Sequence, residues 1–158
     1  PGHDPARADA VAALGPDLLS PALDEVEVAA RLRAAGSRAI GDVLLDQRVV
    51  AGIGNVYRSE LLFLVGVHPR TPAATLSDLM RLRLVRRAVV LLGANARVGA
   101  GRRVTTGRLS PDEALWVYQR TSLPCRRCGT AIESAAEAPV GRRVYWCPRC
   151  QPEAAGSG

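Results

Sequence analysis

The feature that most constrains this chain is its set of four cysteines, which all lie between residues 124 and 150. They form two Cys-x-x-Cys pairs separated by 18 residues, with a glycine beside one pair and a proline inside the other. Two intervening residues let a tight turn direct both thiolates to one point, and two facing turns offer the four sulfur ligands of a tetrahedral zinc site. We therefore predict one zinc ion, bound by Cys125, Cys128, Cys147 and Cys150.

Two other uses of paired cysteines compete with this prediction. Two disulfide bonds would be typical of an exported protein, and the sequence shows no export signal. A thioredoxin-like motif would place one pair at the start of a helix between strands, a context that is absent here. Because four thiolates leave no open position for a substrate, we expect a structural zinc that folds a segment too small to fold alone.

The spacer between the cysteine pairs predicts a β-hairpin. The stretch RRVYW at 142–146 is rich in residues that favour strands, and it follows Pro-Val-Gly at 139–141. We expect two short antiparallel strands, with the turn near Gly141 and Arg142 at or beside the tip.

The rest of the chain predicts helices. Capping residues and apolar spacing place them at 21–35 after Ser20, in a short stretch after Ser37, from Asn55 to about Val65, through 75–96, and from 111 to about 117 after Ser110. In the segment 75–96, apolar residues that include Leu79 are spaced for burial, and arginines that include Arg81 lie on a solvated face. The fold class is therefore mainly α: a helical domain followed by a small four-cysteine zinc-finger β-hairpin.

Positive charge is concentrated in the middle of the chain. The net charge is +6, every basic residue is an arginine, and residues 37–109 hold twelve arginines against four acidic residues, a net +8. A basic segment favours a polyanionic partner, and nucleic acid is the first candidate. The alternative is an arginine-rich face that contacts only water.

The stretch DQRVVAGIGNVYRSELLF at 46–63 predicts a phosphate-binding turn. Gly52 and Gly54 flank Ile53 just before a helix, where glycine allows positive φ and close approach of another backbone. The first amides of a helix have no partner within it, and its dipole favours an anion there, with Asn55 able to add its side-chain amide. Two glycines are a weak motif, so a tight helix–helix turn without a ligand remains the alternative.

Together, LLDQRVVAGIGNVYRSELLFLVGVHP (44–69) and VYQRTSLPCRRCGTAIES with GRRVYWCPRCQ (117–134 and 141–151) resemble the formamidopyrimidine-DNA glycosylase and endonuclease VIII family of base-excision repair enzymes. VTTG at 104–107 resembles the endonuclease VIII-like branch. The resemblance implies a helix–two-turn–helix at about 38–66 that binds phosphates around a lesion, and a zinc-finger hairpin whose tip arginine enters the DNA.

The same resemblance assigns roles to individual residues. Asn55 matches the family's phosphate-binding asparagine, with Gly54 and Val56 on either side of it. Arg142 matches the hairpin-tip arginine by its distance from the third cysteine, and a shift of one residue would place Arg143 there instead. The four cysteines match the zinc ligands of the family.

The catalytic pattern of the family is not matched. Family enzymes use an N-terminal proline that forms a Schiff base, a glutamate directly after it, and a lysine from an N-terminal β-sandwich. This chain begins Pro1-Gly2-His3 and contains no lysine, so we assign no catalytic residue and expect the chain alone to be inactive. The alternative is a complete enzyme that uses Pro1.

We interpret the chain as the DNA-binding C-terminal half of a bifunctional DNA glycosylase/AP lyase for oxidised bases, with Arg142 filling the gap left by a flipped base. A zinc-stabilised protein-interaction module is the third possibility. We expect a DNA-binding domain at 1–118, the zinc finger at 119–152 and a disordered tail at 153–158. The expected partners are double-stranded DNA and the N-terminal catalytic domain of the same protein, in a monomeric, cytoplasmic, nucleoid-associated bacterial protein without a membrane span.

Overall fold

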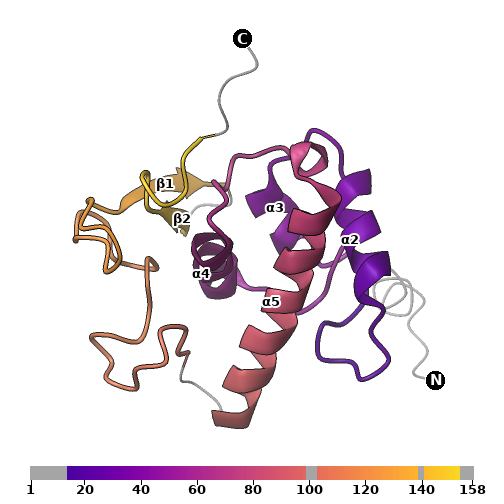
Figure 1. Ribbon diagram of the computed structural model, residues 1–158, viewed down its shortest axis with the longest axis horizontal. Coiled ribbons are helices and arrows are strands. Elements are labelled where there is room, and N and C mark those ends of the chain that lie inside the picture. Colours follow the sequence, from indigo (N-terminus) through magenta and orange to yellow (C-terminus); the bar gives the residue numbers. More distant parts are fainter. Residues whose placement is uncertain (1–13, 99–102, 139–140, 154–158) are drawn as a thin grey trace, which may run out of the picture.

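The computed structural model describes residues 14–98, 103–138 and 141–153. Along the chain the elements are α2 (Glu25–Ala34), α3 (Ile40–Leu45), α4 (Asn55–Val65), the 3-10 helix η1 (Ala73–Thr75), α5 (Asp78–Val98), β1 (Glu133–Glu137) and β2 (Arg142–Trp146). In Figure 1, α5 crosses the molecule, with α2 on one side and α4 and the hairpin on the other. The expected class, mainly α with a small hairpin and four neighbouring cysteines, is confirmed. Pro1 and residues 154–158 of the expected tail lie outside the described residues.

The helices enclose one apolar core to which each of them contributes. The side chains that are at most 1% exposed include Leu32, Ile40, Leu44, Leu62 and Leu84. Burial of one such side chain stabilises a fold by about 1.5–3 kcal/mol. The core therefore holds α4 between α3 and α5, which fixes the position of the turn at the start of α4.

Helix α2 begins later than predicted, at Glu25 instead of near Pro21. Its N-cap is Asp24, whose carboxylate accepts hydrogen bonds from two amides of the first helical turn. A carboxylate at this position also interacts favourably with the helix dipole. The Ser20 hydroxyl accepts only a local bond in the turn before it. The predicted stop is confirmed, because Gly36 follows the helix at φ +65°.

Two expectations for α5 are wrong. Leu79 is 74% exposed. It lies five residues before buried Leu84, which is about 140° around a helix of 100° per residue. Arg81 is buried, because its guanidinium donates to the carbonyls of Ala73 and Leu76 and pairs with Asp78. No helix within the described ranges, including the 21-residue α5, is both long enough and apolar enough to cross a membrane.

The predicted short helix at 111–117 is absent, since these residues form turns. The backbone amides of residues 116–118, which a helix would direct along its axis, instead donate to the carboxylate of Glu60 in α4. A buried carboxylate needs such donors, and this tertiary contact outweighs the local signal of Ser110.

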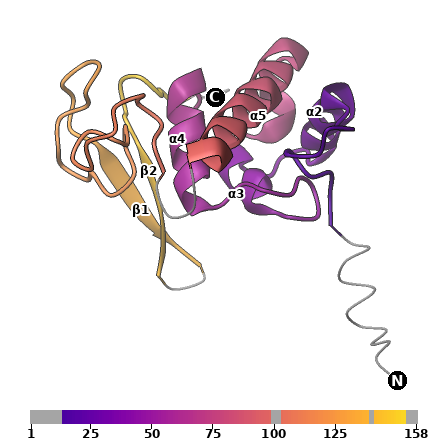
Figure 2. The same cartoon turned by 90° about the horizontal axis from the view of Figure 1, so that it is seen from below.

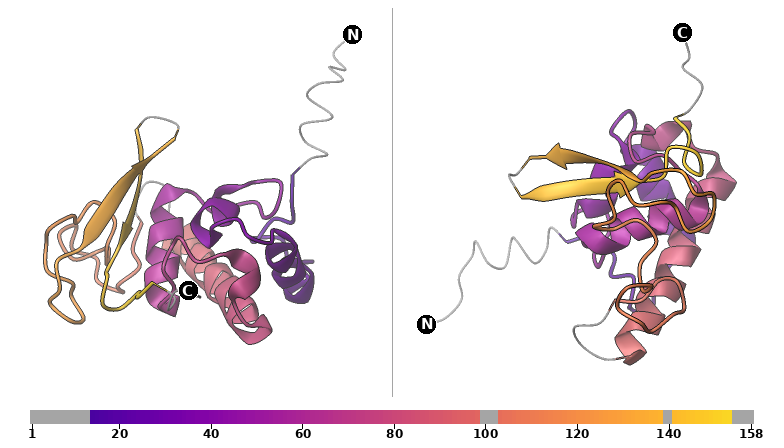
Figure 3. Two further views of the ribbon diagram at one scale, coloured as in Figure 1. Left: turned by 90° about the horizontal axis from the view of Figure 1, so that it is seen from above. Right: turned by 90° about the vertical axis from the view of Figure 1, so that its left-hand side faces the viewer.

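The hairpin has the two expected antiparallel strands. β1 and β2 are paired from Glu133↔Trp146 to Glu137↔Arg142. A second apolar cluster joins it to the helices, formed by Phe63 of α4, Val117, Ile132 and two of the cysteines. The hairpin therefore lies along the side of α4 that faces away from α5 and α2, and its free end extends past the helices (Figure 2). Figure 3 shows the same projection of the two strands from two further directions.

Candidate nucleic-acid interface and metal centre

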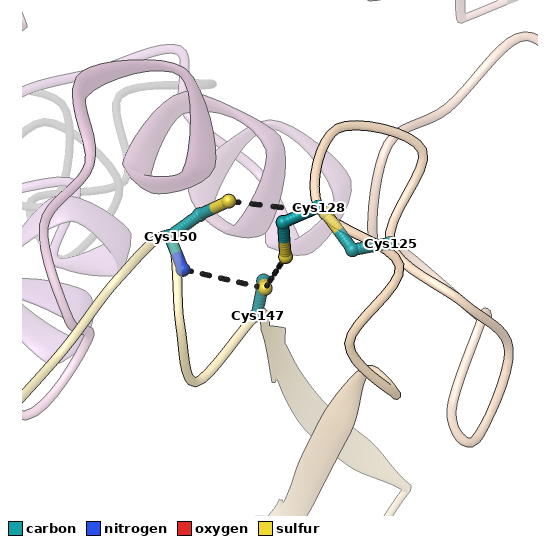
Figure 4. A group of neighbouring side chains, drawn as sticks. All are labelled: Cys125, Cys128, Cys147 and Cys150. Carbon is teal, nitrogen blue, oxygen red and sulfur yellow. Dashed lines mark hydrogen bonds between the residues drawn. The ribbon is translucent and has the colours of Figure 1, made fainter.

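The four cysteine sulfurs form one compact group. All lie within 4.8 Å of one another, with Sγ–Sγ distances of 3.9 Å for Cys125–Cys150 and 3.5 Å for Cys128–Cys147, and none is in a disulfide. Figure 4 shows two loops presenting them to a common centre. A tetrahedral zinc with Zn–S bonds of about 2.3 Å requires sulfurs about 3.8 Å apart. The donor set therefore fits one structural zinc, as the sequence predicts.

The local environment affects the four thiols differently. Hydrogen bonds from Thr130 lower the pKa of Cys128 to about 6, whereas burial raises the pKa of Cys150 to about 12 and raises that of Cys147. Zinc binds thiolates, so its binding must release the protons that burial retains on the second pair. Metal binding and the packing of this module are therefore coupled.

The zinc module is attached to α4 and to the residues that directly follow it. Gln151 donates from Nε2 to the Val67 carbonyl (3.0 Å) and accepts at Oε1 from the Cys147 amide (2.8 Å). The guanidinium of Arg127 lies 4.7 Å from the ring centre of Phe63, which stacks on Trp116 at 5.2 Å. The cysteine loops are thus fixed relative to the helix.

The turn before α4 is built by two glycines in different conformations. Gly52 has φ +121°, a value that other residues adopt only with strain. Gly54, the N-cap of α4, has an ordinary φ of −95°, so its conformation does not require glycine. An added Cβ at Gly54 would meet no atom within 4 Å. Gln47 fixes this turn by accepting from the Gly52 amide and donating to the Ile53 carbonyl, at 3.0 Å each.

A hollow of about 400 Å³ lies at the start of α4, lined by Gly52, Gly54, Asn55, Val56, Tyr57, Arg103 and Tyr118. Within the part of the chain that the structure describes, no side chain caps the first amides of α4, and the helix dipole is positive at this end. The side chain of Val56 is largely buried, so it exposes little surface to the hollow. Sequence reasoning missed Arg103 and Tyr118, because only the fold brings residues 103–118 next to α4.

Glu60 holds the segment that carries Tyr118. Its side chain is fully buried, Oε1 accepts from the Trp116 amide (2.6 Å) and the Thr105 hydroxyl, and Oε2 accepts from the amides of Val117 (2.8 Å) and Tyr118 (3.1 Å). One carboxylate thus accepts from three consecutive backbone donors that have no partner in regular secondary structure. It fixes one wall of the hollow.

The hairpin lies next to Asn55. The side-chain amide of Asn55 donates to the carbonyl of Arg143 across 2.9 Å, a link of 88 residues in sequence. Arg142 and Arg143 are both exposed, and the Arg143 guanidinium donates to the Ser134 hydroxyl (2.9 Å). The structure therefore brings the two groups of predicted DNA-binding residues together at one end of α4.

Two family models match the chain. Residues 14–106 match the formamidopyrimidine-DNA glycosylase H2TH domain, and residues 122–152 match a zinc finger found in FPG and IleRS.

Curated relatives match most of the chain. The DNA-(apurinic or apyrimidinic site) lyase Nei2 of Mycolicibacterium smegmatis is 48% identical over 144 residues, which is 90% of this chain and 54% of the relative. The formamidopyrimidine-DNA glycosylase of Geobacillus kaustophilus is 42% identical over 92% of this chain and 54% of its own length. The chain thus spans about half the length of the curated relatives it matches.

Solved structures agree with these matches. The MutM (Fpg) protein of Thermus thermophilus aligns with a TM-score of 0.79 at 30% identity, covering 96% of this chain and 58% of that one. The Lactococcus lactis Fpg, in complex with DNA that contains an abasic site, aligns with a TM-score of 0.75 at 28% identity, covering 94% and 55%.

Proposed function

This chain belongs to the formamidopyrimidine-DNA glycosylase and endonuclease VIII family, and from this premise we propose that it is the DNA-binding C-terminal half of a DNA glycosylase/AP lyase that acts on oxidised bases. The greater identity to a Nei2 protein than to a formamidopyrimidine-DNA glycosylase favours the endonuclease VIII-like branch. In this proposal the chain binds the duplex, and an N-terminal catalytic domain of the same protein carries out the glycosylase and lyase reactions.

The hollow at the start of α4 is the observation that carries the proposal. Residues 38–66 would act as the helix–two-turn–helix, with a backbone phosphate seated against the first amides of α4. Gly54 supports this role, because its φ does not require glycine and the space beside it is open to an incoming phosphate. Asn55 and Arg103 line the same hollow and supply an amide and a positive charge.

The zinc finger would supply the second contact. Arg142 opens β2, is exposed, and stands at the last pair of the hairpin ladder, where it can reach a phosphate or the gap left by a flipped base. Arg143 would support it from the adjacent position. One zinc ion, held by the four cysteines, would supply no chemistry and would keep the hairpin folded.

The proposal includes a division of the chain into two DNA-binding units. A helical unit at 1–118 and a zinc unit at 119–152 would bind one duplex together as a monomer. Because Arg103 and the hairpin arginines contribute charge, we expect the affinity to fall steeply as salt rises from roughly 50 to 200 mM.

Duplex binding by single variants tests the proposal. We expect Asn55→Ala and Arg142→Ala each to weaken binding of an abasic-site duplex at low salt by about tenfold, the effect of one charge-assisted hydrogen bond. Arg33→Ala is the matched control, because Arg33 lies in α2, on the other side of α5 from the hairpin. If Asn55→Ala and Arg142→Ala bind as tightly as this control, the interface is assigned wrongly.

Borohydride trapping on the same duplex tests whether the catalytic chemistry belongs to another domain. We expect no covalent adduct with this chain, since it contains no lysine and its Pro1 lacks the following glutamate. An adduct would instead identify a nucleophile within these 158 residues.

A further inference from the structure

Arg58, in the second turn of α4, is an arginine that sequence reasoning did not single out. Its side chain is 0% exposed, although arginine is among the residues that are almost never fully buried without a partner. Its Nη2 donates to Oδ1 of Asn55, and its Nη1 lies 2.7 Å from Oε2 of Glu137. One buried guanidinium thus contacts both the proposed phosphate-binding side chain and the end of strand β1.

These contacts determine which way the Asn55 amide faces. The guanidinium can only donate, so it requires the amide oxygen, and the Arg143 carbonyl can only accept, so it requires the amide nitrogen. A flipped amide would lose both bonds. The oxygen is thereby occupied and the nitrogen keeps one free N–H, the group that an anion in the neighbouring hollow would bind.

The other terminal nitrogen of Arg58, Nη1, contacts the hairpin at Glu137. Glu137 is the last residue of β1 and is paired with Arg142 across the ladder. The ion pair therefore ties the hairpin end that carries Arg142 to the same side chain that orients Asn55. This guanidinium therefore links the two proposed DNA contacts, in addition to the direct hydrogen bond from Asn55 to the Arg143 carbonyl.

Stability alone does not account for a buried arginine at this position. Its Nε and Nη1 make no hydrogen bond of good geometry among the described residues, although Nη1 lies 2.7 Å from Glu137, and this is a cost that an apolar side chain would avoid. Buried ion pairs often add little stability compared with apolar residues of similar volume. We infer that Arg58 is a positioning residue, which orients Asn55 and fixes the hairpin beside it for binding to a DNA backbone; this inference rests on the proposed function.

A pair of glutamate variants distinguishes a positioning role of Arg58 from the effect of removing one negative charge. Glu137→Gln breaks the ion pair with Arg58, whereas Glu133→Gln removes the same charge from the other end of β1, where no ion pair forms among the described residues. Electrostatics alone predicts that either change leaves duplex binding equal or tighter, because each removes a negative charge. If Arg58 is a positioning residue, Glu137→Gln should bind an abasic-site duplex about tenfold more weakly than the unchanged chain does. Binding by Glu137→Gln that is as tight as that by Glu133→Gln would overturn the inference.

The Asn55 side-chain amide gives a readout that does not depend on DNA. In the zinc-loaded, 15N-labelled chain, we expect the amide proton of Asn55 that is hydrogen-bonded to the Arg143 carbonyl to exchange with water slowly. Arg58→Met should speed this exchange severalfold without loss of zinc, since the Glu137 side chain is 24% exposed and can be hydrated. An unchanged rate would contradict the positioning role; if Arg58→Met does not fold, the glutamate pair decides.

The outcomes also separate this inference from the proposed function. If Asn55→Ala binds DNA normally, the proposed interface itself is wrong. If Asn55→Ala weakens binding and Glu137→Gln does not, the interface stands and only the role of Arg58 is refuted.

Discussion

Replacing Glu60 by glutamine tests how the seam between α4 and residues 105–118 is held. The glutamine has the same shape, but one of its two terminal atoms becomes a donor. If the nitrogen replaces Oε2, the amides of Val117 and Tyr118 lose their acceptor; if it replaces Oε1, the Trp116 amide loses its acceptor, while the Thr105 hydroxyl can still donate to the Ala114 carbonyl. Either orientation leaves one or two backbone donors without an acceptor.

The expected cost follows from this count. A buried donor left without a partner costs about 1–3 kcal/mol, so one or two cost about 1–6 kcal/mol. This is a large fraction of the roughly 5–15 kcal/mol that stabilises a typical domain. With a shift of about 2–4 °C per kcal/mol, the melting temperature should fall by roughly 10 °C. Because Tyr118 lines the hollow, duplex binding should weaken as well.

Urea and thermal unfolding of the zinc-loaded chain measure this effect. Glu113→Gln is the control, because Glu113 is about half exposed and pairs at the surface with Arg108 at 3.4 Å. Such a surface pair contributes about 0–1 kcal/mol. A Glu60→Gln protein that unfolds within about 0.5 kcal/mol of the control would refute the idea that this carboxylate holds the seam.

Three further perturbations test other parts of the structure. Chelating the zinc should abolish duplex binding but keep most of the far-ultraviolet helical signal, because the helical core contains no cysteine; loss of that signal would show that the helices depend on the metal. Gly52→Ala should destabilise the chain by about 1–3 kcal/mol, since φ is +121° there, whereas Gly54→Ala should leave stability unchanged and weaken DNA binding. The opposite pattern would remove the support that Gly54 gives to a phosphate seat. The Arg48 side chain lowers the pKa of Asp46 from 3.8 to about 2. The stability from this carboxylate is therefore complete above its unfolded pKa and is lost as the pH falls toward 2, so Asp46→Asn should flatten that part of an acid-unfolding curve. An equally steep curve in the variant would assign the acid sensitivity to other groups.

Local sequence signals predicted much of the fold. The cysteine spacing predicted the zinc site, Gly36 the end of α2, and Asn55 the start of α4. Each of these signals acts through residues only a few positions apart, where backbone geometry alone limits the choices. The start of α2 was missed because two capping candidates, Ser20 and Asp24, stand four residues apart, and only the carboxylate of Asp24 reaches the first amides of the helix.

Two of the errors have a common cause, the burial of charged and polar groups. Arg81 was expected to be solvated, but its guanidinium donates to carbonyls of the preceding turn. A helix was expected at 111–117, but backbone amides at its end donate to the Glu60 carboxylate instead. A helical pattern shows which face is apolar. It does not show that a charged side chain will meet a set of unpaired backbone groups, because those groups come from other segments.

The sequence by itself determined that four thiols meet at one metal and that a glycine turn opens a helix, because these properties depend on spacing over a few residues. Only the tertiary structure decided that Glu60 binds amides 56–58 residues away and that the Asn55 amide contacts a carbonyl 88 residues away. Buried polar groups must find partners, and packing of the whole chain decides which partners are within reach.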